Sequence, residues 1–157
     1  METLKSLINE HPFLQTMNPR HREILAECAV ETAFKPNAVI FRQGEYADKF
    51  YIIQSGKVAL ESHVPDRGAI SVQTIGAGEA LGWSWLFPPF VWHFQARALE
   101  HTKAIAFNGA HLLVACEENH DLGYDLMKRV SQVLIQRLQA TRKKLVGPCE
   151  LPRPQLA

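Results

Sequence analysis

The feature that most constrains the fold is a series of short β-branched and aromatic runs between Ala33 and Phe107. These runs are AVIFRQG, FYIIQSGKVALESHV, AISVQTIG and ARALEHTKAIAF. Turn-forming residues separate them at 35–37, 55–56, 65–68 and 76–78. Many short strands at regular spacing, with glycine in the turns, predict a closed or sandwiched antiparallel sheet.

Helical patterns lie on both sides of this β region. Residues 1 to about 32 read as helical, and Asn18 followed by Pro19 is a typical helix start. After the strands we expect a short helix at Ala110–Glu117 and a longer one that begins at Asp121. The apolar residues of the long helix recur every three or four positions: Leu122, Leu126, Val130, Val133, Leu134, Leu138 and, at its end, Leu145.

The length of 157 residues suits one domain with a hydrophobic core. We expect this domain to span residues 1–147, with Gly147-Pro148 ending the long helix and residues 148–157 forming a flexible tail. No long apolar run resembles a signal peptide or a membrane span, so a cytoplasmic location is expected. The formal net charge of +1 gives no electrostatic reason to expect nucleic acid or a membrane surface as partner.

The most unusual segment is GEALGWSWLFPPFVWHFQARA, residues 78–98. It holds all three tryptophans of the chain and three of its eight phenylalanines, but no lysine and a single arginine, Arg97. Glycines at such spacing commonly let backbone N–H groups approach an anion. The aromatic content is therefore unexpected.

Two glycine-centred pieces, FRQGEYADKFYIIQSGKVAL and GAGEALGW, resemble the cyclic-nucleotide-binding domain of the catabolite activator protein and FNR family of regulators. In that family a strand ends in Gln-Gly-acid, and an aromatic-Ile-Ile/Val-x-x-Gly-x-Val strand follows. Gly44 and Gly56 fit turns that need positive φ. The resemblance covers about 7–145 and implies a mainly β double-stranded β-helix (jelly roll) with N-terminal helices and a long C-terminal helix.

The resemblance also implies a phosphate-binding cassette, and here the sequence departs from the family. The family's glutamate, which binds the ribose, corresponds to Trp83, and its arginine, which binds the phosphate, corresponds to Trp92 or His93. Arg97 falls on a structural strand position. The candidate ligand-binding residues are Gly82, Trp83, Ser84, Trp85, Trp92, His93 and Phe94.

Magnitudes favour an aromatic filling of the cassette. A hydrogen bond to a charged group is worth about 1.5–3 kcal/mol, so loss of the arginine alone weakens phosphate binding by roughly ten- to a hundredfold. A tryptophan buries about 150–250 Å², on the order of 4–6 kcal/mol at most. Three readings stay open: the rings plug a vestigial pocket, they form a pocket for a flat or apolar ligand, or they allow an unusual mode of cyclic-nucleotide binding.

Other chemistry finds little support. No histidine pair has HxxxH or HxH spacing, and no CxxC occurs, so neither a metal nor a cofactor is predicted. No GxSxG, P-loop or HExxH motif is present, which indicates a non-enzymatic protein.

The long C-terminal helix is the best partner signal. Family members dimerise through it, and Leu126, Val130, Val133 and Arg137 keep roughly heptad spacing, so a homodimer is expected. Burial of the same stripe against the jelly roll is the alternative. The basic run 142–144, with Arg137, reads as cations that complement the helix dipole. No helix-turn-helix domain follows, so direct DNA binding is not expected, and any partner protein is unknown.

Together these observations predict a stand-alone regulatory or sensory module that does not bind cyclic AMP in the usual way. A small-molecule ligand in the jelly-roll pocket is one possibility under this reading. The alternatives are a genuine cyclic-nucleotide binder with a non-standard mode and a ligand-free protein-interaction scaffold.

Overall fold

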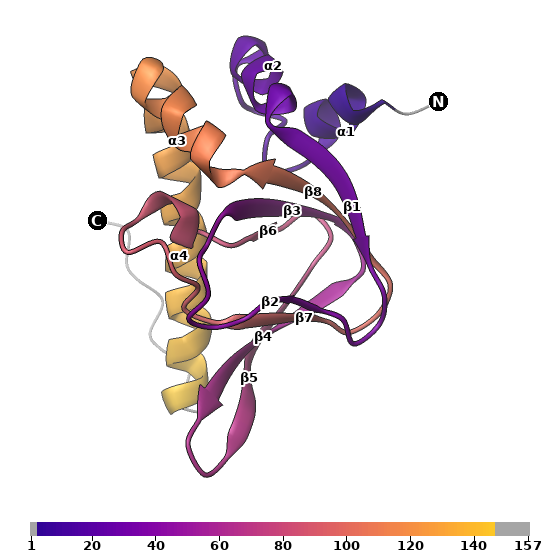
Figure 1. Cartoon of the computed structure of the whole chain (residues 1–157), viewed down its shortest axis with the longest axis vertical. Coiled ribbons are helices and arrows are strands. Elements are labelled where there is room, and N and C mark those ends of the chain that lie inside the picture. The colour runs from indigo at the N-terminus through magenta and orange to yellow at the C-terminus, as the bar shows by residue number, and fades with distance from the viewer. Residues whose placement is uncertain (1–2, 147–157) are drawn as a thin grey trace, which may run out of the picture.

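The computed structural model describes residues 3–146 (Figure 1). The predicted helix end at Gly147-Pro148 and the predicted tail lie outside the described residues. In chain order the elements are α1 (Leu4–Glu10), α2 (Pro19–Glu27), β1 (Ala29–Phe34), β2 (Val39–Phe41), β3 (Lys49–Ser55), β4 (Lys57–Val64), β5 (Gly68–Gly76), β6 (Ala80–Leu81), the 3₁₀ turn η1 (Ser84–Leu86), β7 (Gln95–Ala98), β8 (Thr102–Asn108), α3 (Gly109–Glu118) and α4 (His120–Val146).

Two four-stranded antiparallel sheets form the centre of the molecule. Their strand orders are β1-β8-β3-β6 and β2-β7-β4-β5. Figure 1 shows the helices α1, α2 and α3 at one end of this β structure, while α4 runs along its side. The predicted jelly roll with N-terminal helices and a long C-terminal helix is confirmed.

The structure corrects two boundaries of the prediction. The helical reading of residues 1–32 was wrong at its end, because β1 begins at Ala29 and pairs with β8, Ala29 lying opposite Phe107. Pairing with a long buried strand outweighs the weak helical pattern of residues 29–32. The single run 96–107 is divided into β7 and β8, which belong to different sheets.

The predicted helix starts are close to the observed ones. The Asn18 side chain accepts from the N–H of Arg20, and Pro19 is the first residue of α2. Asn108 caps α3 in the same way through the N–H of His111. The long helix α4 begins one residue before the expected Asp121, at His120. None of the helices within residues 3–146 is long and apolar enough to cross a bilayer.

The core lies on both faces of β3, because successive side chains of a strand point in opposite directions. Phe50 and Ile52 face the helices, where they join a cluster with Leu112, Leu122 and other side chains of α1, α3 and α4. Tyr51 and Ile53 face the interior between the two sheets, where they pack with Val58, Leu60, Ile75 and Leu81. Leu60 and Leu81 of the second cluster also border the cavity at the segment 82–94.

The apolar stripe of α4 packs on the rest of the same chain along most of its length. Leu122, Leu126, Val130 and Val133 are buried. The predicted stripe does not continue to the helix end, since Leu138 is 70% exposed and Leu145 is 84% exposed. The side chain that follows Val133 on the buried face is Arg137, which brings a charge into the wall of the domain.

Candidate ligand-binding site

The segment 82–94 links β6 to β7 and forms the cassette predicted from the sequence. The chain leaves β6 at Gly82, whose φ is +89°, a conformation that costs glycine nothing sterically. A Cβ at this position would lie 2.7 Å from Cζ3 of Trp92. Glycine is needed at position 82 because the Trp92 indole packs directly against its Cα.

Trp92 is fixed inside the domain through both its ring and its backbone. Its side chain is only 4% exposed, and its ring stacks on Phe41 with centroids 3.7 Å apart and planes 10° apart. Its N–H donates to the carbonyl of Glu45, and its carbonyl accepts from the N–H of Gly44, each at 2.9 Å. The ring therefore occupies the interior end of the cassette.

Trp83 forms the outer wall of the same space. It is half-buried and stacks on the exposed ring of His93, with centroids 4.7 Å apart, and it meets Phe87 edge-on at 6.4 Å. The buried hydroxyl of Ser84 lies 3.1 Å from Nδ1 of His93. The Ser84 hydroxyl, which the sequence predicted as a ligand contact, therefore already has a hydrogen-bond partner within the cassette.

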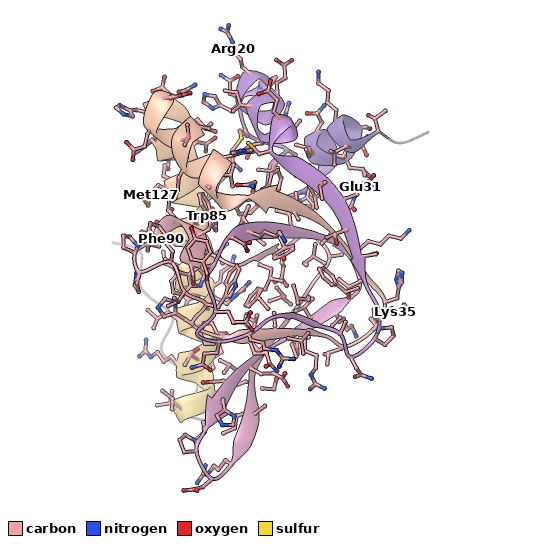
Figure 2. All side chains as sticks on the ribbon, viewed as in Figure 1. Arg20, Glu31, Lys35, Trp85, Phe90 and Met127 are labelled. Carbon is pink, nitrogen blue, oxygen red and sulfur yellow. The ribbon has the colours of Figure 1, made fainter. Side chains whose placement is uncertain are left out.

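Trp85 does not join this space. It is 1% exposed and belongs to the helix-side core, where its ring lies 5.7 Å from that of Phe50. Figure 2 shows Trp85 and Phe90 on the side of the molecule along which α4 runs. Phe90 has a φ of +57°, and its carbonyl accepts from the N–H of Ala47, so the loop is tied to the segment before β3.

The space enclosed by the cassette is about 20 Å³, which is room for roughly one water molecule. Six of the seven predicted site residues border it, and Trp85 is the exception. The complete lining is Phe41, Leu60, Leu81, Gly82, Trp83, Ser84, Trp92, His93, Phe94 and Arg137. The structure brings Trp83 and Trp92, which the sequence predicted to stand at the family's ligand-binding positions, to the wall of the same cavity.

Arg97 forms an ion pair with Glu61. Its Nε and Nη2 donate to the two carboxylate oxygens of Glu61 at 3.1 and 2.7 Å, and Gln95 donates to the same carboxylate. The hydrogen bond from Arg97 is the main reason that the pKa of Glu61 lies below its ordinary value. The strand role predicted for Arg97 agrees with this geometry.

Arg137 borders the cavity, and the sequence reading missed this. Its side chain is 8% exposed, and its Nη2 donates to the carbonyl of Ala80 at 2.8 Å. Burial lowers the pKa of Arg137, and the nearby charge of Glu79 acts in the opposite direction. Reading it as a cation for the helix dipole was wrong, because the guanidinium reaches across to β6. The signal was present in the spacing, since residue 137 continues the buried series 126, 130 and 133.

The four residues predicted for a dimer interface all pack within one chain. Leu126, Val130, Val133 and Arg137 are between 1% and 9% exposed, which is the burial that the alternative reading described. The homodimer itself stays a prediction. No group of three His, Cys, Asp or Glu side chains within residues 3–146 is arranged to hold a metal ion.

Comparison with known proteins gives a family match and several similar solved structures. The family model of the cyclic nucleotide-binding domain matches residues 31–119, more than half of the chain. The solved structure of a candidate cyclic nucleotide-binding protein from Geobacter metallireducens is 25% identical; the match covers 88% of this chain and 99% of that one, with a TM-score of 0.76.

Two kinase regulatory subunits are also similar. The regulatory subunit of a cAMP-independent protein kinase A from Trypanosoma brucei is 25% identical, with a TM-score of 0.68; the match covers 83% of this chain and 46% of that one. The cAMP-dependent protein kinase regulatory subunit of Schizosaccharomyces pombe is 25% identical over 104 residues, 66% of this chain. The matched region spans about a quarter of that curated relative, 24% of its length.

Proposed function

The chain belongs to the cyclic nucleotide-binding domain family, and on this premise we propose that it is a regulatory module whose pocket is closed to cyclic nucleotides by Trp83 and Trp92. The observation that carries the proposal is the cavity of about 20 Å³ between these rings. Pockets for small molecules usually hold about 300–1,000 Å³. A cyclic nucleotide therefore has to displace at least one indole before it can enter.

Displacement of Trp92 is costly. The ring is 4% exposed, stacks on Phe41 and packs against Gly82. Removing a buried tryptophan from a core costs about 3–5 kcal/mol. The phosphate would meet one arginine of the cavity wall, Arg137, but none at position 92, and Arg97 is paired with Glu61. The balance favours the tryptophans over the nucleotide.

The site also supports a regulatory role in place of a catalytic one. The Ser84 hydroxyl and the His93 ring are hydrogen-bonded to each other, but the hydroxyl borders a space of about 20 Å³, which is too small for a substrate while Trp83 and Trp92 stay in place. One wall of that space comes from α4 through Arg137. A change in the cavity would therefore reach the long helix directly, and this helix would transmit the signal to a partner.

A titration of the protein with cyclic AMP and cyclic GMP, followed by tryptophan fluorescence, tests this function. Trp83 and Trp92 line the cavity, so binding there has to change their emission. We expect no saturable change up to millimolar nucleotide. A saturable change at micromolar concentration would overturn the proposal in favour of genuine cyclic-nucleotide binding.

A second candidate is a protein-interaction module, and the exposed face of α4 favours it. Tyr124, Met127, Leu138 and Leu145 are between 41% and 84% exposed. With the half-buried residues Ser131, Leu134 and Thr141, of which Leu134 also packs on the core, they follow alternating steps of three and four, the spacing of a coiled-coil seam. We place the expected homodimer on this seam, in place of the four buried residues considered from the sequence.

Replacing Leu138 with glutamate is expected to weaken the dimer without unfolding the domain, because Leu138 is 70% exposed within one chain. Burying a leucine contributes about 1.5–3 kcal/mol and a dimer loses two of them, so the dissociation constant should rise roughly a hundredfold or more. Sedimentation equilibrium measures this constant. The matched control is Gln136→Glu, which adds the same charge on another exposed part of α4. An unchanged dissociation constant for Leu138→Glu, or an equal rise for both variants, would contradict the seam.

A further inference from the structure

The cavity has one charged side chain in its wall, and this charge lacks a counter-ion. Arg137 makes a hydrogen bond to the carbonyl of Ala80, but within residues 3–146 it forms no ion pair. The charge of Glu79 acts on Arg137, but Oε2 of Glu79 accepts from the N–H of Gly76 at 2.6 Å. The guanidinium keeps its charge in spite of burial, because arginine does not deprotonate in proteins.

A buried charge without a partner is costly, and such charges in proteins are normally paired. One backbone carbonyl satisfies a single donor of the five that a guanidinium carries. The remaining N–H donors of Arg137 are part of a side chain that borders the cavity. An anion that enters this cavity would therefore meet a preformed positive charge at low local dielectric, where the attraction is strong.

The rest of the wall restricts the kind of anion. It consists of aromatic and aliphatic side chains, including Phe41, Leu60 and Phe94, and it contains no acidic side chain. The one hydroxyl, that of Ser84, is bonded to His93. A sugar phosphate needs several polar partners that this wall does not provide. A ring that bears one carboxylate needs an apolar wall and one guanidinium.

We propose that Arg137 is the anion-recognition residue of this pocket and that the ligand class is a small aromatic carboxylate, bound with its ring among the cassette aromatics. This inference rests on the proposed function, since it concerns the same pocket closed to cyclic nucleotides. The carboxylate accepts from the guanidinium, which offers two parallel donors to such a group.

The ligand can enter only if the cavity becomes larger, and Trp83 is the side chain that has to move. Trp83 is half-buried and its stacking partner His93 is exposed, whereas Trp92 is fixed by Phe41 and by two backbone hydrogen bonds. The ligand ring takes over the stacking surface that Trp83 leaves. Binding also engages Arg137, which joins α4 to the carbonyl of Ala80, so occupancy of the pocket changes the contact between α4 and β6.

The test uses benzoate as the probe and benzamide as its uncharged counterpart, at constant ionic strength. Calorimetry and tryptophan fluorescence report binding to the wild-type chain, to Arg137→Met and to the control Arg142→Met, in which an exposed arginine of the same helix is lost. We expect saturable benzoate binding to the wild type and to Arg142→Met. Binding to Arg137→Met should be at least about tenfold weaker, because a hydrogen bond to a charged group is lost. Benzamide should bind the wild type at least about tenfold more weakly than benzoate does.

Folding of each variant is checked by circular dichroism, and Arg137→Lys provides a second variant that keeps the charge. It should bind benzoate with an affinity between those of the wild type and Arg137→Met. Equal binding of benzoate and benzamide would overturn the inference, and so would equal losses in Arg137→Met and Arg142→Met or the absence of benzoate binding to the wild type. These outcomes leave the proposed function standing, because that function fails only if cyclic AMP or cyclic GMP binds the wild-type pocket.

Discussion

The variant Trp92→Ala is expected to lose about 3–5 kcal/mol of unfolding free energy, the usual cost of truncating a buried tryptophan. The reason is the position of the ring, which is 4% exposed, stacked on Phe41 and in contact with Gly82. The surrounding backbone is fixed by hydrogen bonds to Gly44 and Glu45, so it cannot collapse fully into the cavity. Equilibrium unfolding in urea measures the loss.

Trp83→Ala is the matched control for this variant. Trp83 is half-buried and its partner His93 is exposed, so truncation should cost less, about 0.5–2 kcal/mol. Equal losses for the two variants, or a loss below about 1 kcal/mol for Trp92→Ala, would contradict the view that Trp92 is the main filling of the pocket. The two unfolding free energies can be compared only if both variants show the same slope of free energy against urea concentration. A changed slope indicates a different unfolded or native state.

The second large effect is a gain of function. The double variant Trp83→Glu/Trp92→Arg introduces an acid at position 83 and an arginine at one of the two positions, 92 or 93, that the resemblance implies for it, and it removes the two indole rings from the cavity wall. Each charged hydrogen bond contributes about 1.5–3 kcal/mol, so affinity for cyclic AMP should rise by roughly a hundredfold or more. Calorimetry with cyclic AMP on the folded variant checks this result.

The control here is Trp83→Phe/Trp92→Phe, which enlarges the cavity without adding a charge. It should gain less affinity for cyclic AMP than the charged variant, because it adds no acid for the ribose and no second arginine for the phosphate beside Arg137. If the charged variant is folded but releases no heat with cyclic AMP, the assignment of positions 83 and 92 is wrong. An equal gain in the phenylalanine variant would show that space alone limits binding.

The architecture was predictable because strands, turns and helix caps are encoded locally. Asn18 and Asn108 cap helices in the structure, and Gly44 and Gly56 have the positive φ that their turns require. The first strand was not predictable from local pattern. Residues 29–34 become a strand because β8 lies beside them, and that pairing joins segments separated by a large part of the chain.

Six of the seven residues predicted for the site border the cavity, but the directions of neighbouring side chains were not predictable. Trp83 and Trp85 are separated by one residue in a segment with a 3₁₀ turn, where the direction of the side chain changes by about 120° per residue. One ring therefore faces the cavity and the other the helix-side core. Arg137 shows the opposite case, since its helical spacing gave the right face but its charge suggested the surface.

If indole rings occupy the place where a cyclic nucleotide would sit, crystals of the wild-type chain soaked in millimolar cyclic AMP should diffract without showing bound nucleotide. We expect Trp92 stacked on Phe41, with no nucleotide density between β6 and β7. Density for cyclic AMP in the cassette, with the Trp92 ring turned away from Phe41, would contradict this expectation.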